Sequence, residues 1–491
     1  MSNLVILPII IPLFAGIILA FANKRTPLAR ILTKLFSVAN LGVAAYLAWL
    51  VINQGSLILE TGDWAAPYGI IFVADPLAVI IVLTTNIVAT ACAFYAPHAL
   101  SDAKEKHYFY AFFFFLISGV SGAFLTGDLF NLFVFFEVLL MASYALIVLG
   151  GGKVQLRESL KYVLINLVSS VIFVTAVAFL YSVVGTVNMA QIAERIQEVE
   201  QQGILTTIGI LLFFVFATKA AVFPLYYWMP HSYIVPNPVV SALFGALLTK
   251  VGIYSVLRVF SLMFVINIDL THQLFLWIAG LSMVFGVIGA LSTNNIKLIV
   301  AYNVIPAIGF ILLGIGVLNQ DGVSGSIYYL VHDMLIKAAL FMIVGVIAYV
   351  AGTSDLRKMG GLIHHYPQLG WLLFIAAFVL AGIPPFSGFI GKLLLLKGAF
   401  SNDEIALVII GLLTSLLILY SVMKIFIKGF WGEKDDTLQK KSTKGLIGPI
   451  VFLLTFSIIL GVGAEYIYPS VESISTYLLD PNIYIESVLK E

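Results

Sequence analysis

The sequence predicts an all-α polytopic membrane protein with about fourteen transmembrane helices. Hydrophobic residues make up 61% of the 491 residues and charged residues only 10%, and the mean hydropathy is +1.06. Globular proteins carry roughly 25% charged residues, so most of this chain must lie in lipid. In addition, apolar stretches recur at about the length, roughly 20 residues, that a helix needs to cross a bilayer.

Polar residues, prolines and glycines separate these apolar stretches and mark the connections between helices. The stretches fall at residues 4–22, 30–51, 74–96, 107–126, 129–149, 160–184, 204–228, 238–260, 273–291, 297–318, 325–350, 369–397, 404–430 and 446–468. The first has no basic residue before it and no small-residue cleavage site. We therefore expect an uncleaved helix there and not a secretory signal.

The distribution of positive charge predicts how the helices are oriented. When the stretches are numbered in order, the connections after odd-numbered helices hold 18 of the 26 lysines and arginines. Cytoplasmic loops are the ones enriched in these residues. We therefore expect a multi-pass protein of the bacterial cell membrane with both termini on the outer side.

Other classes of function find little support in the composition. The net charge is +1, and no basic tract is long enough to suggest nucleic acid as a partner. The single cysteine, Cys92, lies in an apolar run, so neither a disulfide framework nor a thiolate metal cluster is expected. The sequence has no CxxC and no GxGxxG in a nucleotide-binding context, and we therefore expect no cofactor.

An internal repeat appears when the chain is shifted by 166 or 167 residues. The strongest match places 245–260 over 411–426, with Tyr254 over Tyr420. The repeating unit is five helices, the fourth to the eighth and the ninth to the thirteenth. Because five is odd, the second copy must start from the opposite side of the membrane, which is the inverted repeat of secondary transporters.

This repeat divides the chain into four predicted segments. They are the first three helices (1–106), the first repeat (107–260), the second repeat (261–430), and the last helix with its tail (431–491).

Two lysines, Lys219 and Lys250, lie inside apolar helices on either side of a proline-broken connection. A lysine at the centre of a spanning helix costs roughly 2.5 to 3.5 kcal/mol on insertion scales, so each needs a polar cavity or a partner. Pro224 has no N–H and leaves the carbonyl of Ala220 without its helical donor. The pattern is typical of an ion pathway, although each lysine could instead only reach the interface or tie two helices together.

A second broken helix is predicted in residues 381–398. Pro384 and Pro385 should free the carbonyls of Leu380 and Ala381, and Lys392 follows about two turns later. The seventh and twelfth helices are therefore both expected to be broken, one in each repeat. Broken helices in spanning segments commonly line transport sites.

The other ionisable residues inside the predicted helices are Glu137, His332, Asp333 and Lys337. Glu137 is expected to pair with Lys219, either as a static ion pair or as one whose changing separation controls how tightly the lysine holds its proton. His332 and Asp333 are consecutive and must point to different faces, so a metal site is not expected. His332 could serve either as a proton relay or in hydrogen-bonded packing.

Carboxylates elsewhere suggest simpler roles. Asp128 and Asp355 stand at helix ends, where capping is expected.

Residues 185–203 predict a short amphipathic helix at the surface, with a solvated face. Within the spans only Glu137 and Asp333 could ligate Na⁺, which favours a proton path over a sodium cage in this chain.

The run PLYYWMPHSYIVPNPVVSALFGALLTKVGIYSVLR at 224–258, together with Glu137 and AGIPPFSGFIGK at 381–392, resembles a known family. It is similar to the antiporter-like proton-translocating membrane subunits shared by respiratory complex I and the Mrp multisubunit cation/proton antiporters. The resemblance covers nearly the whole chain. It implies fourteen core helices, breaks in the seventh and twelfth, and a central hydrophilic axis carried by Glu137, Lys219, Lys250 and Lys392.

The chain departs from the complex I pattern at three positions. Tyr226, His231 and Tyr233 stand where His, Asp and His are usual, so that His231 would have to replace those histidines in proton uptake. With the chain length, these departures look most like the D-type subunits of the Mrp multisubunit Na⁺/H⁺ antiporters. The resemblance then implies subunits of the A, B, C, E, F and G types as partners, in a lipid bilayer, with H⁺ and Na⁺ as transported ions.

We therefore expect a non-enzymatic proton translocator coupled to Na⁺ export. The alternatives are a proton-pumping subunit of complex I or of a membrane-bound hydrogenase, and a structural scaffold that would tolerate neutral replacement of its charged residues. The expected route is one continuous bent path rather than two equivalent half-channels. It would run from His231 through Lys219 and Lys250 to Lys337 and His332, and out by Lys392.

Overall fold

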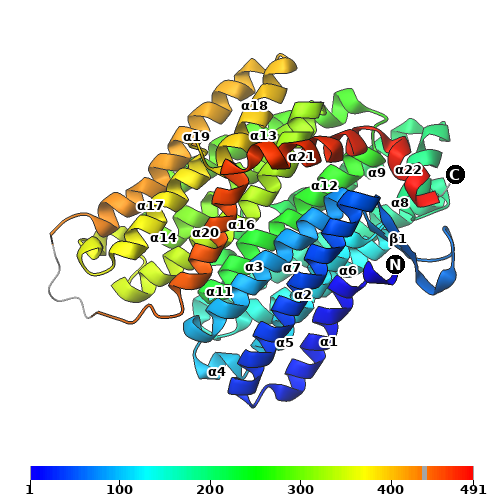
Figure 1. Ribbon diagram of the computed structural model, residues 1–491. Helices are drawn as coiled ribbons and strands as arrows, with labels where there is room; N and C mark the ends of the chain where they lie inside the picture. Colours follow the sequence, from blue (N-terminus) through cyan, green and yellow to red (C-terminus); the bar gives the residue numbers. More distant parts are fainter. Residues whose placement is uncertain (1, 434–439, 490–491) are drawn as a thin grey trace.

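The computed structural model describes residues 2–433 and 440–489 and is almost entirely helical (Figure 1). The predicted all-α class is confirmed, apart from one small sheet of two strands. Of the predicted last segment, 431–491, the stretch 434–439 and residues 490–491 lie outside the described residues.

The chain order of the elements is as follows. The first part contains α1 (Leu7–Ala22), α2 (Thr26–Gln54), β1 (Leu57–Glu60), β2 (Ile71–Ala74), α3 (Pro76–Ala99), α4 (Asp102–Glu105), α5 (Phe109–Leu125), α6 (Leu129–Val148), α7 (Lys153–Val184), α8 (Met189–Arg195), α9 (Gln202–Ala220), α10 (Met229–Ile234), α11 (Pro238–Leu243) and α12 (Thr249–Leu262). The second part contains α13 (Ile268–Ser292), α14 (Ile296–Tyr302), α15 (Val304–Val317), α16 (Gln320–Ala351), α17 (Pro367–Ala381), α18 (Ser387–Ser401), α19 (Ile405–Ile425), α20 (Ile447–Val462), α21 (Ala464–Leu479) and α22 (Pro481–Leu489).

In the described residues, ten helices are long and apolar enough to cross a membrane. The number rises to 11 if α20 and α21, which meet at 82°, count as one bent span. Three shorter apolar helices, α1, α5 and α17, do not reach that length on their own. The chain is therefore a multi-pass membrane protein.

Helix α16 lies at the centre of the molecule, and α7 and α19 lie at its edge. The most apolar part of α16 is 83% buried, whereas the corresponding parts of α7 and α19 are 39% and 33% buried. Helix α16 packs against α15, α17, α18, α20 and α11. Most side chains in the middle of α16 are therefore shielded from lipid, whereas α7 buries only the face that carries residues such as Asn166 and Ser170.

Both predicted breaks are present. Helix α9 ends at Ala220, and Pro224 stands in the non-helical stretch before α10. Helix α17 ends at Ala381, and the stretch with Pro384 and Pro385 separates it from α18. The sequence did not predict two other irregularities, an interruption at Asn303 between α14 and α15 and a π-helical turn at Phe244–Leu248 between α11 and α12.

The two predicted caps are confirmed. Asp128 accepts a hydrogen bond from the N–H of Asn131 (2.7 Å) at the start of α6. Asp355 accepts one from the N–H of Arg357 (3.1 Å). Both acids therefore satisfy backbone donors that a helix start leaves unpaired.

The N- and C-termini lie at the same end of the helix bundle (Figure 1). The turn Ser2–Leu4 packs on β1, and α22 packs on α8. Helix α8 is the short helix expected in 185–203, but its residues from Met189 to Ala193 are buried. The other face is solvated, as expected, since Glu194, Gln197 and Glu198 are exposed, and α22 covers the buried face.

Candidate functional site

Lys219 stands one residue before the end of α9 and is 4% exposed. Its ammonium donates to the hydroxyl of Ser170 on α7 (3.3 Å) and lies 5.0 Å from the ring centre of Phe136 on α6. Lys219 forms no ion pair within the described part of the chain. The ammonium is thus stabilised by one neutral hydroxyl and by the face of an aromatic ring, a cation–π contact.

The expected direct contact between Glu137 and Lys219 is not present among the described residues. Consecutive residues on a helix point about 100° apart, and Phe136 is the one that faces Lys219. Glu137 is partly exposed on α6 and interacts electrostatically with Lys219 at longer range than an ion pair, and its Oε1 is buried without a hydrogen-bond partner among the described residues.

Lys250 follows the π-helical turn Phe244–Leu248 and is fully buried. Its ammonium donates to the carbonyl of Gly245 in that turn (2.8 Å) and to the hydroxyl of Thr249 (3.3 Å). Irregular π-helical turns inside α-helices often occur at functional sites. Here the turn supplies the main-chain acceptor on which Lys250 depends.

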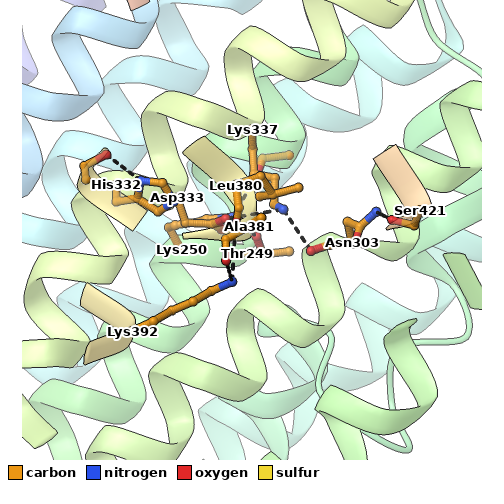
Figure 2. Close-up of polar contacts among 12 residues, drawn as sticks. Thr249, Lys250, Asn303, His332, Asp333, Lys337, Leu380, Ala381, Lys392 and Ser421 are labelled. Atoms are coloured by element: carbon orange, nitrogen blue, oxygen red, sulfur yellow. Dashed lines mark hydrogen bonds and ion pairs between the residues drawn. The ribbon is translucent and has the colours of Figure 1, made fainter. Parts of the chain in front are cut away.

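Asp333 on α16 joins two lysines into one cluster (Figure 2). Its carboxylate lies 2.6 Å from the ammonium of Lys250 and 3.4 Å from that of Lys337, and the three side chains have no exposed surface. We call Lys250, Asp333 and Lys337 the charged cluster. Two ammonium groups share one carboxylate in it, so one positive charge is left for neutral groups to stabilise.

The second lysine of the charged cluster also uses a helix interruption. The ammonium of Lys337 donates to the carbonyl of Asn303 (2.8 Å), which stands between α14 and α15. The side-chain amide of Asn303 donates in turn to the hydroxyl of Ser421 on α19 (2.9 Å). The charged cluster is thus connected to the outer helix α19 by hydrogen bonds (Figure 2).

His332 points away from the charged cluster, as the consecutive numbering predicts. Its Nδ1 is 2.7 Å from the hydroxyl of Ser387 at the start of α18, which is 2.8 Å from the hydroxyl of Ser457 on α20. A side chain at Gly388 would meet the imidazole ring at 2.9 Å, so the glycine allows this close approach.

Lys392 is bound by the carbonyls that the second break was predicted to free. Its ammonium donates to the carbonyls of Leu380 (3.1 Å) and Ala381 (2.8 Å), the last two residues of α17 (Figure 2). The rings of Phe310 and Tyr329 lie 5.0 and 5.9 Å from it. The helix break therefore takes the place of a counter-ion.

Tyr329 connects the two polar groups at this end of the site. Its ring centre lies 5.1 Å from that of His332 and 5.9 Å from the ammonium of Lys392. Its hydroxyl is buried and has no hydrogen-bond partner in the described part of the chain. The charged cluster, His332 and Lys392 thus gather around α16, whereas Lys219 stands apart on α9.

Two of the three positions that depart from the complex I pattern differ in exposure. His231 lies on α10 and is exposed, whereas Tyr233 is fully buried against the rings of Trp228 and Phe244. His231 is therefore accessible from the surface, and Tyr233 serves packing.

Sequence reasoning missed two ion pairs. Asp333 was not predicted as the partner of Lys250, although its spacing of four residues from Lys337 places both on one helix face. Arg258, near the end of the predicted stretch 238–260, was given no partner, but it is 4% exposed and its Nη2 lies 2.5 Å from Oδ2 of Asp75. The ring of Tyr484 on α22 covers Arg258 at 5.4 Å, and no local pattern indicates this covering.

Within the described residues, no group of three or more His, Cys, Asp and Glu side chains could hold a metal ion.

The model of the NADH:quinone oxidoreductase/Mrp antiporter transmembrane family matches residues 126–418. The chain is 50% identical, over the full length of both chains, to the D-type subunit of the Na⁺/H⁺ antiporter of Bacillus subtilis strain 168. It belongs to the family of D-type Mrp antiporter subunits.

Two further comparisons agree with this D-type family. The D-type subunit of the Na⁺/H⁺ antiporter of Alkalihalophilus pseudofirmus is 49% identical, again over the full length of both chains. A chain in the structure of the Mrp complex from Dietzia sp. superposes with a TM-score of 0.92 at 28% identity, covering 99% of each chain. The family resemblance predicted from the motifs at 224–258 and 381–392 is confirmed.

Proposed function

We propose that this chain is the proton-translocating subunit of a multisubunit Na⁺/H⁺ antiporter and that its role is transport and not catalysis. The observation that carries the proposal is the charged cluster of Lys250, Asp333 and Lys337, fully buried among helices long enough to span a membrane. Ionisable groups at such depth are costly and mark ion pathways. The relatives, which are named as D-type subunits of Na⁺/H⁺ antiporters, support the same conclusion.

The cluster suggests how a proton could be moved. Asp333 lies closer to Lys250 than to Lys337. A shift of the carboxylate toward Lys337 would leave the ammonium of Lys250 uncompensated, and a buried ammonium without a counter-ion is under pressure to release its proton. The proposed step is therefore an exchange of one carboxylate between two lysines, with a proton leaving the lysine that loses it.

The proposed route extends from the cluster in both directions. It begins at the exposed His231, passes Lys219 and Lys250, and leaves through Lys337, His332 and Lys392. Its second half is supported by the short contacts around α16 and by the position of Tyr329 between His332 and Lys392. Its first half is supported by the close packing of α9 on α12, the helices that carry Lys219 and Lys250. A side-chain carbon at Gly252 on α12 would stand only 2.9 Å from the backbone of Lys219 on α9.

We propose the inverted five-helix repeat, 107–260 and 261–430, as the frame of this route. Helices α7 and α16 support it, since both contain 32 residues and their bounds are related by a shift of 167. An isolated bridge between Asp128 and Asn188 has its counterpart, at the same shift, in the bridge between Asn295 and Asp355.

Fourteen spans follow from the same frame. Helices α1, α5 and α20 would each cross the membrane, and α17 and α18 together would form the broken twelfth span. The first three helices (1–106) and the last helix with its tail (431–491) would flank the two repeats. Both termini would then lie outside the cytoplasm, in keeping with the excess of lysine and arginine in the connections after odd-numbered spans.

Partners of the A, B, C, E, F and G types complete the proposal. The solved Mrp complex contains a chain of this fold, which supports assembly into a complex. The partly exposed Glu137 gives a physical reason for such an assembly, because a carboxylate at the middle of a spanning helix needs a hydrogen-bonding partner and its buried Oε1 has none among the described residues.

The experiment is Na⁺/H⁺ exchange by the whole complex in everted vesicles from a host that lacks its own antiporters. We expect added Na⁺ to collapse a preformed pH gradient, followed with a pH-sensitive fluorescent dye. A complex that ignores Na⁺ but moves protons when NADH or a quinone is supplied would overturn this proposal in favour of an oxidoreductase subunit.

A further inference from the structure

A cavity of about 580 Å³ lies between α2, α3 and α20, and none of its lining residues belongs to the proton route. Its volume falls in the range of small-molecule sites, ~300 to 1,000 Å³. Each helix contributes residues spaced so that they share one face. They include Lys34 and Leu41 on α2, Phe94 and His98 on α3, and Gly448 and Phe452 on α20. We call this cavity the α2–α3–α20 groove.

The groove is polar at one end and apolar at the other. Lys34 and His98 stand at the same end, because α2 begins there and α3 finishes there. Leu41 follows Lys34 by seven residues, about 10 Å along the helix axis. The wall between these depths is formed mainly by apolar side chains, including Phe94 and Phe452. The lining therefore matches an amphiphile with one polar end.

The positive charge of Lys34 is available to a ligand. The ammonium lies 5.3 Å from the ring centre of Phe94 and has no ion pair in the described part of the chain. One turn earlier, Arg30 is already neutralised by Asp102 (2.8 Å) and Glu105 (2.9 Å). The mouth of the groove thus carries one uncompensated cation, to which a phosphate is complementary.

The groove faces outward. Val38 on its α2 wall is 50% exposed and Phe94 on its α3 wall is 40% exposed, although both helices are long enough to span. A side chain at Gly448 would meet no atom within 4 Å, so the glycine leaves open space in the α20 wall. Such an apolar, open wall on helices long enough to span is suited to contact with lipid.

We propose that the α2–α3–α20 groove binds one anionic phospholipid, with its phosphate at Lys34 and an acyl chain along Leu41, Phe94 and Phe452. Basic pockets between spanning helices are suited to anionic headgroups. A free phosphate would leave the apolar depth of the groove unused. A zwitterionic lipid would place a second cation near Lys34 and lose part of the attraction.

The test measures lipid retained by the purified complex, by native mass spectrometry, after exchange into dioleoylphosphatidylglycerol or dioleoylphosphatidylcholine. Gly448→Leu fills the groove, and Lys34→Gln removes the charge at similar length. Gly42→Leu and Lys24→Gln are matched controls, since Gly42 also has open space around it and neither residue lines the groove. Val38→Trp replaces Gly448→Leu if that variant melts at a lower temperature than the wild type.

We expect one phosphatidylglycerol to be retained, with about fivefold weaker retention in Lys34→Gln, as the loss of one lysine near a headgroup predicts. Groove filling should abolish retention, and both controls should behave as the wild type. Equal retention of phosphatidylcholine would overturn the anionic headgroup. Retention unchanged by groove filling would place the lipid elsewhere. A disulfide between a Val38→Cys variant and a neighbouring subunit would show that a protein covers the groove, and would also overturn the proposal.

Discussion

The two long helices α7 and α16 occupy corresponding positions of the proposed repeat but differ in charge. Asp333 on α16 corresponds to Asn166 on α7, and Lys337 corresponds to Ser170, each at a shift of 167. Asn166 donates to the carbonyl of Tyr162 within its own helix (2.9 Å), and Ser170 accepts from Lys219. The same backbone frame thus carries neutral polar groups in one half and an ion cluster in the other.

Burial at these positions does not explain the difference, because Asn166 and Ser170 are only 1% and 5% exposed. The partners differ instead. The carboxylate of Asp333 lies near two ammonium groups, those of Lys250 and Lys337, whereas Asn166 bonds within α7 and Ser170 accepts from Lys219. The comparison indicates that the partners supplied by neighbouring helices, more than the sequence frame of one helix, decide where charge can be kept. Substitutions at both helices and at the groups around them test it.

Replacing the shared carboxylate should have the largest effect. Asp333→Asn leaves two buried ammonium groups without a counter-ion, a loss on the order of 3 to 5 kcal/mol for a broken buried pair. We expect Na⁺/H⁺ exchange in everted vesicles to disappear. The matched control is Asn166→Ala at the corresponding position of α7, which should keep most of the activity. Normal exchange by an assembled Asp333→Asn complex would contradict the shared-carboxylate mechanism.

Replacing Lys219 or Lys250, the two lysines of the first repeat, with arginine distinguishes a role in proton transfer from a purely electrostatic role. Arginine holds its charge, so Lys250→Arg should lose at least about tenfold in exchange rate, an increase of ~1.4 kcal/mol in the barrier. Lys219→Arg should also fail, with a loss close to that of Lys219→Ala. The measurement is the initial exchange rate at equal expression. Full activity in either arginine variant would assign that lysine a purely electrostatic role.

Glu137→Gln tests the acid that does not reach its expected partner. The change keeps the volume and removes the charge, and we expect exchange to be lost while the protein still inserts and assembles. The measurement combines exchange in vesicles with recovery of the whole complex by affinity purification. A well-assembled variant that exchanges at the normal rate would show that Glu137 has no part in the route.

The two helix breaks should differ in importance. A Pro384→Ala, Pro385→Ala double variant restores N–H donors that compete with Lys392 for the carbonyls of Leu380 and Ala381. We expect a loss of exchange of several-fold, on the order of 1 kcal/mol for one hydrogen bond to a charged group. Pro224→Ala should lose less, because Lys219 is bound by a hydroxyl and a ring. Equal losses would mean that the breaks act by shaping the helices alone.

The smallest effect is expected at the cap of α6. Burial raises the pKa of the Asp128 carboxyl to about 6, although the N–H of Asn131 acts in the opposite direction. The folded protein then holds this proton more tightly than the unfolded chain, whose aspartate pKa is about 3.9. Stability from this group is therefore present below about pH 4 and is lost as the pH rises through about 6.

Asp128→Asn should remove that pH dependence and keep the cap, since Asn295 caps α14 at the corresponding position. We expect the variant to gain on the order of 1 kcal/mol over the wild type at pH 7. Melting temperatures of the purified complex at pH 4 and pH 7 provide the measurement. An identical dependence of the melting temperature on pH in both proteins would show that the pKa of the Asp128 carboxyl is not raised.

The sequence by itself determined the multi-pass helical class, the two breaks and the identity of the charged residues. Apolar lengths near 20 residues are dictated by the thickness of the bilayer, and each proline removes one backbone N–H, so both features are local. Pro12, Pro97 and Pro469 nevertheless lie inside continuous helices, so a proline alone does not fix a break. The binding of Lys392 by the carbonyls of Leu380 and Ala381 follows from the same local effect, because the break and the lysine are separated by about two helical turns.

Only the tertiary structure decided which charges meet. Asp333 binds Lys250 because of how α12 and α16 are rotated about their own axes, which depends on the packing of every neighbouring helix. The same kind of rotation brings the ring of Phe136 to 5.0 Å from the ammonium of Lys219, while Glu137 stays outside ion-pair distance. The burial of Arg258 under α22 joins residues more than 200 positions apart. Spacing along one chain carries no information on such rotations, since apolar side chains allow a spanning helix to face its neighbours in several ways.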